Sequence, residues 1–145
     1  MRLLARTATT LATLLAVGAS ALTTGCGSDA TSPQDQFPGT YTLRTVNGQS
    51  LPVVYNQDAS GTTYVTSDVY TFNSDGTLSE LAALRFTPAS GGTATTQSAT
   101  YTGTWTLSGT SVTAQLSDNT SFTGTFSGGN TITVNDGGVT LVLQK

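Results

Sequence analysis

Apolar and polar residues alternate strictly between Ala99 and Leu107, in the segment A-T-Y-T-G-T-W-T-L. Every odd position carries a small or apolar residue, and every even position from Thr100 to Thr106 carries threonine. A period of two is typical of a β-strand that buries one face and exposes the other to water. The segment also contains the chain's only tryptophan, Trp105, and tryptophan is the largest side chain that a core can bury. We therefore expect a core strand here.

The alternation continues to the end of the chain in short segments separated by glycine, asparagine, aspartate and serine. The expected strands place on one face Val112, Ala114 and Leu116, then Phe122, Gly124 and Phe126, then Ile132 and Val134, and finally Val139, Leu141 and Leu143. Short turns between strands of about six residues predict an antiparallel meander of hydrogen-bonded neighbours.

The first half of the folded region alternates less regularly but still predicts strands. Residues Gly39–Val46 form one expected strand, which ends at the tight-turn pair Asn47-Gly48. A less regular strand covers 51–57. In the next, over 62–73, the aromatic residues share one parity and Val65 and Val69 have the other, and a bulge near Ser67-Asp68 would reconcile the two halves.

Residues 78–86 are expected as a strand with Leu78, Ala82, Leu84 and Phe86 pointing inward, and Glu80 shares their parity. A short helix over 79–85 is the alternative. Residues 88–97 are rich in Ser, Thr, Gly and Ala, and this composition predicts a mobile loop.

Eight to ten such strands would leave exposed edges unless the sheet closes on itself. We therefore predict an all-β fold, a small antiparallel up-and-down barrel over residues 37–145, with an open two-sheet sandwich as the alternative. The frame aromatic-T-G-T-aromatic occurs at 101–105 and again at 122–126. A glycine between two inward aromatic residues favours sharp strand curvature, and a ligand contact at this glycine is the second interpretation.

The N-terminal segment resembles a bacterial lipoprotein signal. Met1 to Arg6 is positively charged, and an apolar run of about a dozen residues, too short to span a bilayer, follows it. The segment Leu22 to Cys26 resembles a lipobox, although its leucine lies four residues before the cysteine where three is usual. We expect a signal peptide over 1–25, a lipid anchor on Cys26 and a flexible tether over 26–36.

The resemblance implies anchoring in the bacterial cell envelope. Because Gly27 follows the cysteine, the aspartate that retains some lipoproteins in the inner membrane is absent, so we expect the outer membrane, facing the periplasm. Ordinary signal-peptidase cleavage after the Ala19-Ser20-Ala21 motif, which would leave a secreted protein with a free thiol, is the alternative. A single cysteine cannot form an internal disulfide.

Charged residues make up 9% of the chain, and the formal net charge is −3, whereas an average globular protein is about 25% charged. Without Arg2 and Arg6, three basic residues face eight acidic ones and leave about −5. Such a chain would repel nucleic acids and anionic lipid head groups. Neither is an expected partner, and the sequence names no protein partner.

Most enzyme chemistries lack their usual residues. The chain contains no histidine, so the commonest general base and zinc ligand are missing. No nucleophile elbow or phosphate-binding glycine loop occurs. The Asn-Ser-Asp-Gly segment at 73–76 lacks the further ligands of a calcium loop. We expect no catalytic residues, no metal site and no cofactor, and hence no enzyme.

The motifs G-T-Y-T-L at 39–43, N-G-x-x-L-P, T-F-N-S-D-G-T-L at 71–78, G-T-W-T-L-S-G at 103–109 and the final V-T-L-V-L-Q-K resemble the lipocalin-like domains of small bacterial lipoproteins. True lipocalins carry G-x-W in the first strand, where this chain has Gly39-Thr40-Tyr41, and they carry a C-terminal helix, where we expect a strand at the end of this sequence. The resemblance implies a barrel that holds a small apolar molecule.

Two function hypotheses follow. In the first, inward side chains line a ligand cavity: Tyr41, Tyr70, Phe72, Leu84, Phe86, Tyr101, Trp105, Phe122 and Phe126. Glu80 would meet the ligand's polar end or pair with Arg85 or Arg44, although a solvated glutamate explains it as well. In the second hypothesis the same aromatic residues fill the barrel, which is then a structural or protein-interaction module. An eight-stranded barrel is compatible with both.

Overall fold

The computed structural model describes residues 32–145. The predicted signal peptide, the lipidation site Cys26 and most of the predicted tether lie outside the described residues. In order along the chain, the described elements are α1 (Pro33–Gln36), β1 (Gly39–Val46), β2 (Gln49–Ser50), β3 (Val53–Asp58), β4 (Gly61–Phe72), β5 (Thr77–Pro88), β6 (Thr95–Ser108), β7 (Ser111–Leu116), β8 (Ser121–Ser127), β9 (Thr131–Asp136) and β10 (Val139–Gln144).

The strands form one antiparallel sheet that closes into a barrel. Neighbouring strands follow the order β2-β1-β10-β9-β8-β7-β6-β5-β4-β3, and a further pairing joins β1 to β4. That pairing, from Gly39 opposite Phe72 to Thr42 opposite Val69, closes a ring of eight strands and leaves β2 and β3 as additions. The predicted barrel is confirmed, and the open sandwich is wrong.

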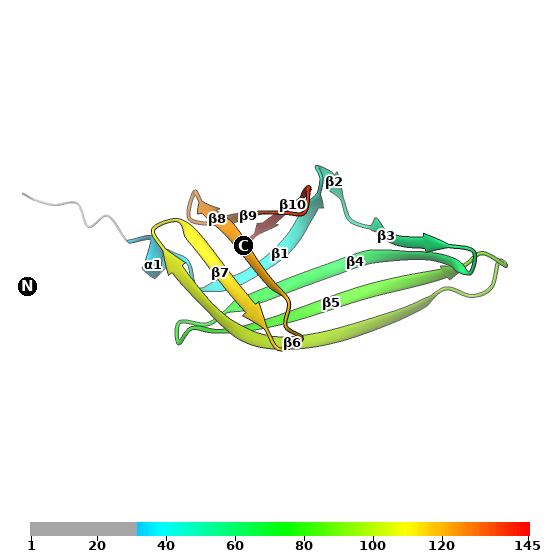
Figure 1. Ribbon diagram of the computed structural model, residues 1–145, viewed down its shortest axis with the longest axis horizontal. Helices are drawn as coiled ribbons and strands as arrows, with labels where there is room; N and C mark the ends of the chain where they lie inside the picture. Colours follow the sequence, from blue (N-terminus) through cyan, green and yellow to red (C-terminus); the bar gives the residue numbers. More distant parts are fainter. Residues whose placement is uncertain (1–31) are drawn as a thin grey trace, which may run out of the picture. The chain divides into compact units, whose positions relative to one another are not determined.

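Three strands are much longer than the rest. β4 and β5 contain 12 residues each and β6 contains 14, whereas β7 contains 6. They continue past the ends of β7 and β8 as a curved arm, and β3 pairs with the far part of β4 along its edge (Figure 1). The barrel wall is therefore higher on one side than on the other.

The structure settles the least regular part of the sequence. β5 is a strand throughout, so the alternative helix over 79–85 is wrong. The register between β4 and β5 shifts between Val65 and Ser67, which confirms a bulge within one residue of its predicted place. β6 begins at Thr95, so the predicted loop over 88–97 is too long at both ends. The first residues of β6, which are mostly threonine, pair with β5 but bury no apolar side chains. Alternation of apolar and polar residues therefore does not reveal this part of β6.

Short polar motifs form the turns between the strands. Asn47 and Gly48 both adopt positive φ angles, 51° and 79°, as a two-residue hairpin turn requires. In three other turns an aspartate accepts hydrogen bonds from the backbone N–H and the hydroxyl of the residue two positions later: Asp58 from Ser60, Asp75 from Thr77 and Asp118 from Thr120. These hydrogen bonds lower the pKa of each carboxyl.

Part of the predicted tether belongs to the folded domain. The side chain of Ser32 caps α1 by accepting from the N–H of Asp35. Gln34 then donates from Nε2 to the carbonyl oxygen of Leu107 at 2.7 Å, which fixes α1 to the end of β6. The domain therefore begins by Ser32 and not at Phe37, because α1 covers one end of the barrel.

Candidate ligand-binding site

Eight of the nine predicted lining residues fall into two groups, one toward each end of the barrel, which meet where Tyr70 stacks on Phe72 with 6.3 Å between ring centroids. Tyr41, Phe72, Trp105 and Phe126 surround Phe37, whose ring centroid lies 5.6, 4.9, 4.6 and 5.1 Å from theirs respectively. Phe37, at the end of α1, has no exposed surface. We call these five residues the aromatic plug.

Polar groups of the aromatic plug are also satisfied. The hydroxyl of Tyr41 donates to the carbonyl oxygen of Phe37 at 2.7 Å, and Trp105 donates from Nε1 to the carbonyl oxygen of Asn73 at 2.9 Å. Lys145 lies over the Tyr41 ring, 5.3 Å from its centroid, and donates to the carbonyl oxygen of Gln36. At this end the rings pack against each other, as the second hypothesis expects.

The opposite end of the barrel contains a cavity of about 320 Å³ that opens to solvent. It lies between the long strands β4–β6 and the turn from β7 to β8, and we call it the mouth cavity. Its lining is Tyr55, Val65, Asp68, Tyr70, Glu80, Ala82, Leu84, Tyr101, Leu116, Asp118, Thr120, Ser121 and Phe122. Four of the predicted lining residues are among them: Tyr70, Leu84, Tyr101 and Phe122.

A buried carboxyl pair is the most unusual feature of the mouth cavity. Asp68 on β4 and Glu80 on β5 are each only 9% exposed. The hydroxyl of Tyr70 donates to Oδ2 of Asp68 at 3.0 Å. Oδ1 of Asp68 is buried and accepts no hydrogen bond from the described residues. An unpaired buried carboxylate is costly, because the protein interior does not replace the water it has lost.

The pair lowers this cost by retaining a proton. Burial first, and then the charge of Glu80, raise the pKa of Asp68 to about 7, and a hydrogen bond to Glu80 favours the protonated form of Asp68. Burial also raises the pKa of Glu80. Two neighbouring carboxyls in a buried site commonly share one proton in this way. The pKa of Tyr70 is raised as well, mainly by burial, so its hydroxyl remains a donor.

Other predicted site residues lie elsewhere. Arg85 is exposed on the outer face of β5, over the ring of Tyr64 with 5.1 Å to its centroid, and Arg44 is exposed on β1. The predicted pairing of Glu80 with either arginine is therefore replaced by its pairing with Asp68. Phe86 lies on the arm, against the backbone of Gly61, and lines a separate hollow with Thr63 and Leu84.

Sequence reasoning missed two residues of importance. The sequence marks Phe37 only as the start of the domain, because a lone aromatic residue beside a proline carries no strand pattern. Tyr55 at the cavity rim is 70% exposed, and its strand alternates too weakly to assign a face. Asp68 did carry a signal, since an aspartate in the middle of a strand, beside a predicted bulge, is unusual.

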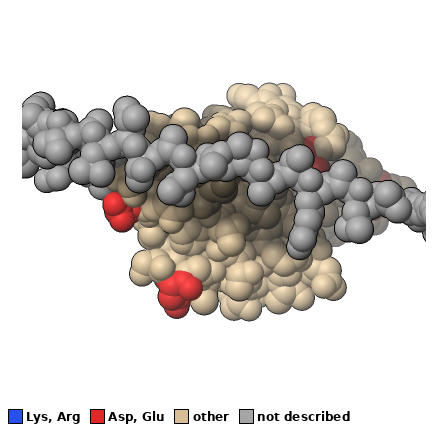
Figure 2. Space-filling view, turned by 60° about the vertical axis from the view of Figure 1, so that its left-hand side comes forward, with Lys and Arg blue, Asp and Glu red and all other residues tan. Residues whose placement is uncertain are grey.

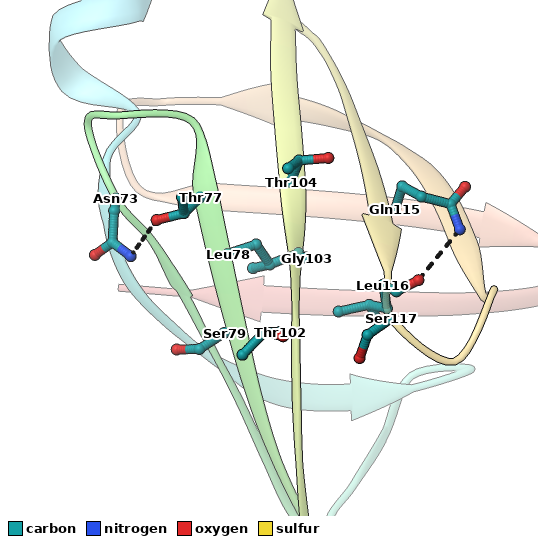
Figure 3. Close-up of a pocket in the computed structure, with 10 residues that line it drawn as sticks. All are labelled: Asn73, Thr77, Leu78, Ser79, Thr102, Gly103, Thr104, Gln115, Leu116 and Ser117. Atoms are coloured by element: carbon teal, nitrogen blue, oxygen red, sulfur yellow. Dashed lines mark hydrogen bonds between the residues drawn. The ribbon is translucent and has the colours of Figure 1, made fainter.

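A second hollow lies on the outside of the barrel. It measures about 510 Å³ over β5, β6 and β7, where serine, threonine, asparagine and glutamine side chains surround Leu78, Gly103 and Leu116 (Figure 3). None of its lining residues is ionisable, and several of its polar groups already bond to one another: Asn73 donates to Thr77, and Gln115 donates to the carbonyl oxygen of Leu116. It is a shallow, wide-open surface hollow.

The outer surface is mostly uncharged. On the face shown in Figure 2, uncharged residues cover almost all of the described surface and acidic residues appear at isolated positions. Among residues 32–145, no group of three side chains suited to metal binding comes together. No helix in this described part of the chain is long and apolar enough to cross a membrane.

Comparison with known proteins adds one structure. No protein-family model matches the chain, and no curated protein sequence matches it. The structure is similar to the crystal structure of a lipocalin-like protein from Bacteroides uniformis. The two chains are 19% identical, the match covers 76% of this chain and 98% of the other, and the TM-score is 0.45.

Proposed function

We propose that the domain binds a small, largely apolar molecule in the mouth cavity. The supporting observation is the contrast between the two ends of the barrel. The aromatic plug fills one end, while the other end keeps an open cavity of about 320 Å³ with walls formed mainly by aromatic and aliphatic side chains. Protein sites for small molecules start at about 300 Å³ and combine apolar walls with a few polar groups.

The proposal narrows the predicted site. Of the nine residues expected to line it, Tyr70, Leu84, Tyr101 and Phe122 remain, and Glu80 supplies a polar contact. The four predicted residues in the aromatic plug act instead as core. The hypothesis of a filled barrel therefore applies to one end of the molecule, and the ligand hypothesis applies to the other.

We also propose that this binding takes place at the bacterial cell envelope. The support is the sequence before the barrel: a charged start, a short apolar run and Cys26 in a lipobox-like setting. Replacing Cys26 with serine should move the protein from the membrane fraction to the soluble periplasmic fraction. Membrane association that survives this change would contradict the lipid anchor.

A cavity-filling variant tests the binding site. Ala82 lines the mouth cavity, whereas its neighbour Ala83 has the opposite parity on β5 and does not. We expect Ala82→Phe to abolish binding and Ala83→Phe, as the matched control, to retain it. Native mass spectrometry of the protein isolated from cells, followed by titration with neutral aromatic probes, measures both.

The outcomes separate the two hypotheses. A bound mass that is present in the wild-type protein and in Ala83→Phe, but absent from Ala82→Phe, would support the mouth cavity as the site. If neither a bound mass nor probe binding is detected in the wild-type protein, the structural-module hypothesis holds and the proposed function is wrong. Trp105 lies in the aromatic plug and is therefore a poor reporter for this end.

A further inference from the structure

We infer that the ligand of the mouth cavity is a small organic cation, an ammonium compound whose charged nitrogen meets Asp68 and Glu80 while its apolar body lies against the aromatic wall. This inference rests on the proposed function, because it names the ligand class of the same cavity. It is argued from three features of the cavity: an unpaired acceptor, the aromatic rings around it and the sign of its charge.

The unpaired acceptor is Oδ1 of Asp68. Nearly all buried polar atoms in folded proteins have a hydrogen-bond partner, so an exception calls for an explanation. Asp68 is 9% exposed and lines the cavity; its protonated carboxyl bonds to Glu80, but once it is ionised no described N–H or O–H group donates to Oδ1. Tyr70, the hydroxyl nearest in the site, is already committed to Oδ2. A donor from a ligand would complete this carboxylate.

Aromatic rings form much of the surrounding wall. Tyr70 and Phe122 meet edge to face, with 5.6 Å between ring centroids, and Tyr101 and Tyr55 line the same cavity. Ring faces attract organic cations, and cages of aromatic side chains are a recurrent way of binding ammonium groups. With a neutral ligand the same rings make only apolar contacts. They therefore favour a cation, provided that its charge is paired with a carboxylate.

The charge of the cavity has one sign. Its ionisable lining residues are Asp68, Glu80 and Asp118, together with the three tyrosines, and no basic side chain is among them. An anionic ligand would therefore be repelled. Ca²⁺ and Mg²⁺ take six or more oxygen ligands, and two carboxyls beside a wall of aromatic rings do not provide them. An organic cation matches both the charge and the wall.

Binding should exchange a proton for the cation. In the empty cavity the carboxyl pair keeps a proton, with the pKa of Asp68 near 7, and an ammonium group would replace it. The other groups that face the pair are Tyr70, Tyr101 and Tyr55, and Asp118, whose pKa is lowered by its own turn. Affinity for a cation should therefore fall as the pH falls below about 7.

Three matched probes test the ligand class: 2-phenylethylamine as the cation, 2-phenylethanol as its neutral analogue and phenylacetate as the anion. We expect isothermal titration of the full-length protein at pH 8 to show the amine binding about tenfold or more tightly than the alcohol, the scale of a hydrogen bond to a charged group. Between pH 8 and pH 5.5 the amine should lose up to about 30-fold in affinity, which is the effect of one proton with a pKa near 7. The alcohol should show little change.

Asp68→Asn should remove the advantage of the amine over the alcohol. Asp136→Asn, which removes the same charge at an exposed position that does not line the mouth cavity, is the matched control. Glu80→Gln should also weaken binding of the amine.

Each result decides a different point. Equal affinities for amine and alcohol, or tightest binding of phenylacetate, would overturn the cation inference and leave the proposed function standing. An amine advantage that survives in Asp68→Asn would overturn it as well. If none of the three probes binds at pH 8, the proposed function fails together with the inference.

Discussion

Replacing Asp68 with asparagine should make the protein more stable at pH 8. Asp68 is 9% exposed, and burial together with Glu80 raises its pKa from 3.8 to about 7. A difference of about three pKa units corresponds to about 4 kcal/mol, which the folded state loses when this carboxyl must be ionised. Asparagine has a similar volume, and its side-chain oxygen can still accept the hydrogen bond from Tyr70.

The sign follows from proton binding in the two states. Because the folded-state pKa is raised, the folded protein keeps a proton between about pH 4 and pH 7 that the unfolded chain has lost. Wild-type stability should therefore fall as the pH rises through this window and level off above it. In Asp68→Asn this fall in stability with rising pH is absent. A smaller fall due to Glu80 remains, because burial raises the pKa of Glu80 too. The difference between variant and wild type should be small near pH 4 and largest at pH 8.

Urea unfolding at pH 4.5, 6 and 8 measures this difference, with the emission of Trp105 in the aromatic plug as the signal. We expect Asp68→Asn to exceed the wild type by about 2–4 kcal/mol at pH 8, with the lower end allowing for the remaining carboxyl. Asp136→Asn should follow the wild type at every pH, since it removes an exposed charge. The reasoning is refuted if Asp68→Asn is no more stable than the wild type at pH 8, or if the two pH profiles run parallel.

Three further predictions concern the core, one strand and the turns. Phe37→Ala should lower the free energy of unfolding by about 3–5 kcal/mol, because Phe37 is fully buried among four rings; urea unfolding measures this, and a loss under about 1 kcal/mol would contradict it. Gly103→Ala should reduce the melting temperature sharply, since a Cβ there would lie 2.1 Å from the carbonyl oxygen of Gln115, whereas Gly92→Ala meets nothing closer than 3.6 Å and should change little. Below about pH 4 the wild type should lose stability, because the lowered pKa values of the three turn carboxyls favour folding only while they stay ionised; an acid titration that stays flat to pH 2 would contradict this.

Much of the fold could be predicted from the sequence because two local signals agree along most of the chain. In β7–β10, apolar residues alternate with threonine and serine, and short turns of glycine, asparagine and aspartate separate the segments. Each signal is local, so neither depends on the rest of the structure. A meander of short strands then has few ways to hide its edges, and closure is the simplest.

Other features depend on contacts between distant segments. α1 has only four residues, and it is held by Gln34 donating to Leu107, 73 positions along the chain. The first residues of β6 pair with β5 but bury nothing, so alternation could not reveal them. Which inward aromatic residues fill the barrel and which line a cavity is set by the unequal strand lengths together with the place of Phe37. The strand lengths and the position of Phe37 cannot be derived from the period-two pattern.

The carboxyl pair shows the same limit most clearly. Alternation alone places Glu80 on the inner face, since β5 runs without a shift beside β6. Asp68 shares the parity of Tyr70 and Phe72 on β4, and the register with β5 runs without a shift from Ser67 to Phe72, so alternation places Asp68 on the inner face as well. The bulge between Val65 and Ser67 instead brings Val65 onto this face, where it lines the mouth cavity beside Asp68. What brings the two acids together is the register between β4 and β5, which the alternation within either strand does not give.

Stability and binding make opposite demands on Asp68. The aromatic plug buries large side chains with their polar atoms satisfied, as a core does, whereas the mouth cavity keeps a buried carboxylate oxygen without a donor. Asparagine keeps an acceptor for the Tyr70 hydroxyl, so a gain in stability at neutral pH would show that the negative charge of Asp68 does not serve the fold. If Asp68→Asn proves both more stable and unable to distinguish an amine from an alcohol, the two results have one cause: the carboxylate oxygen that folding leaves without a donor is the one that the ligand completes.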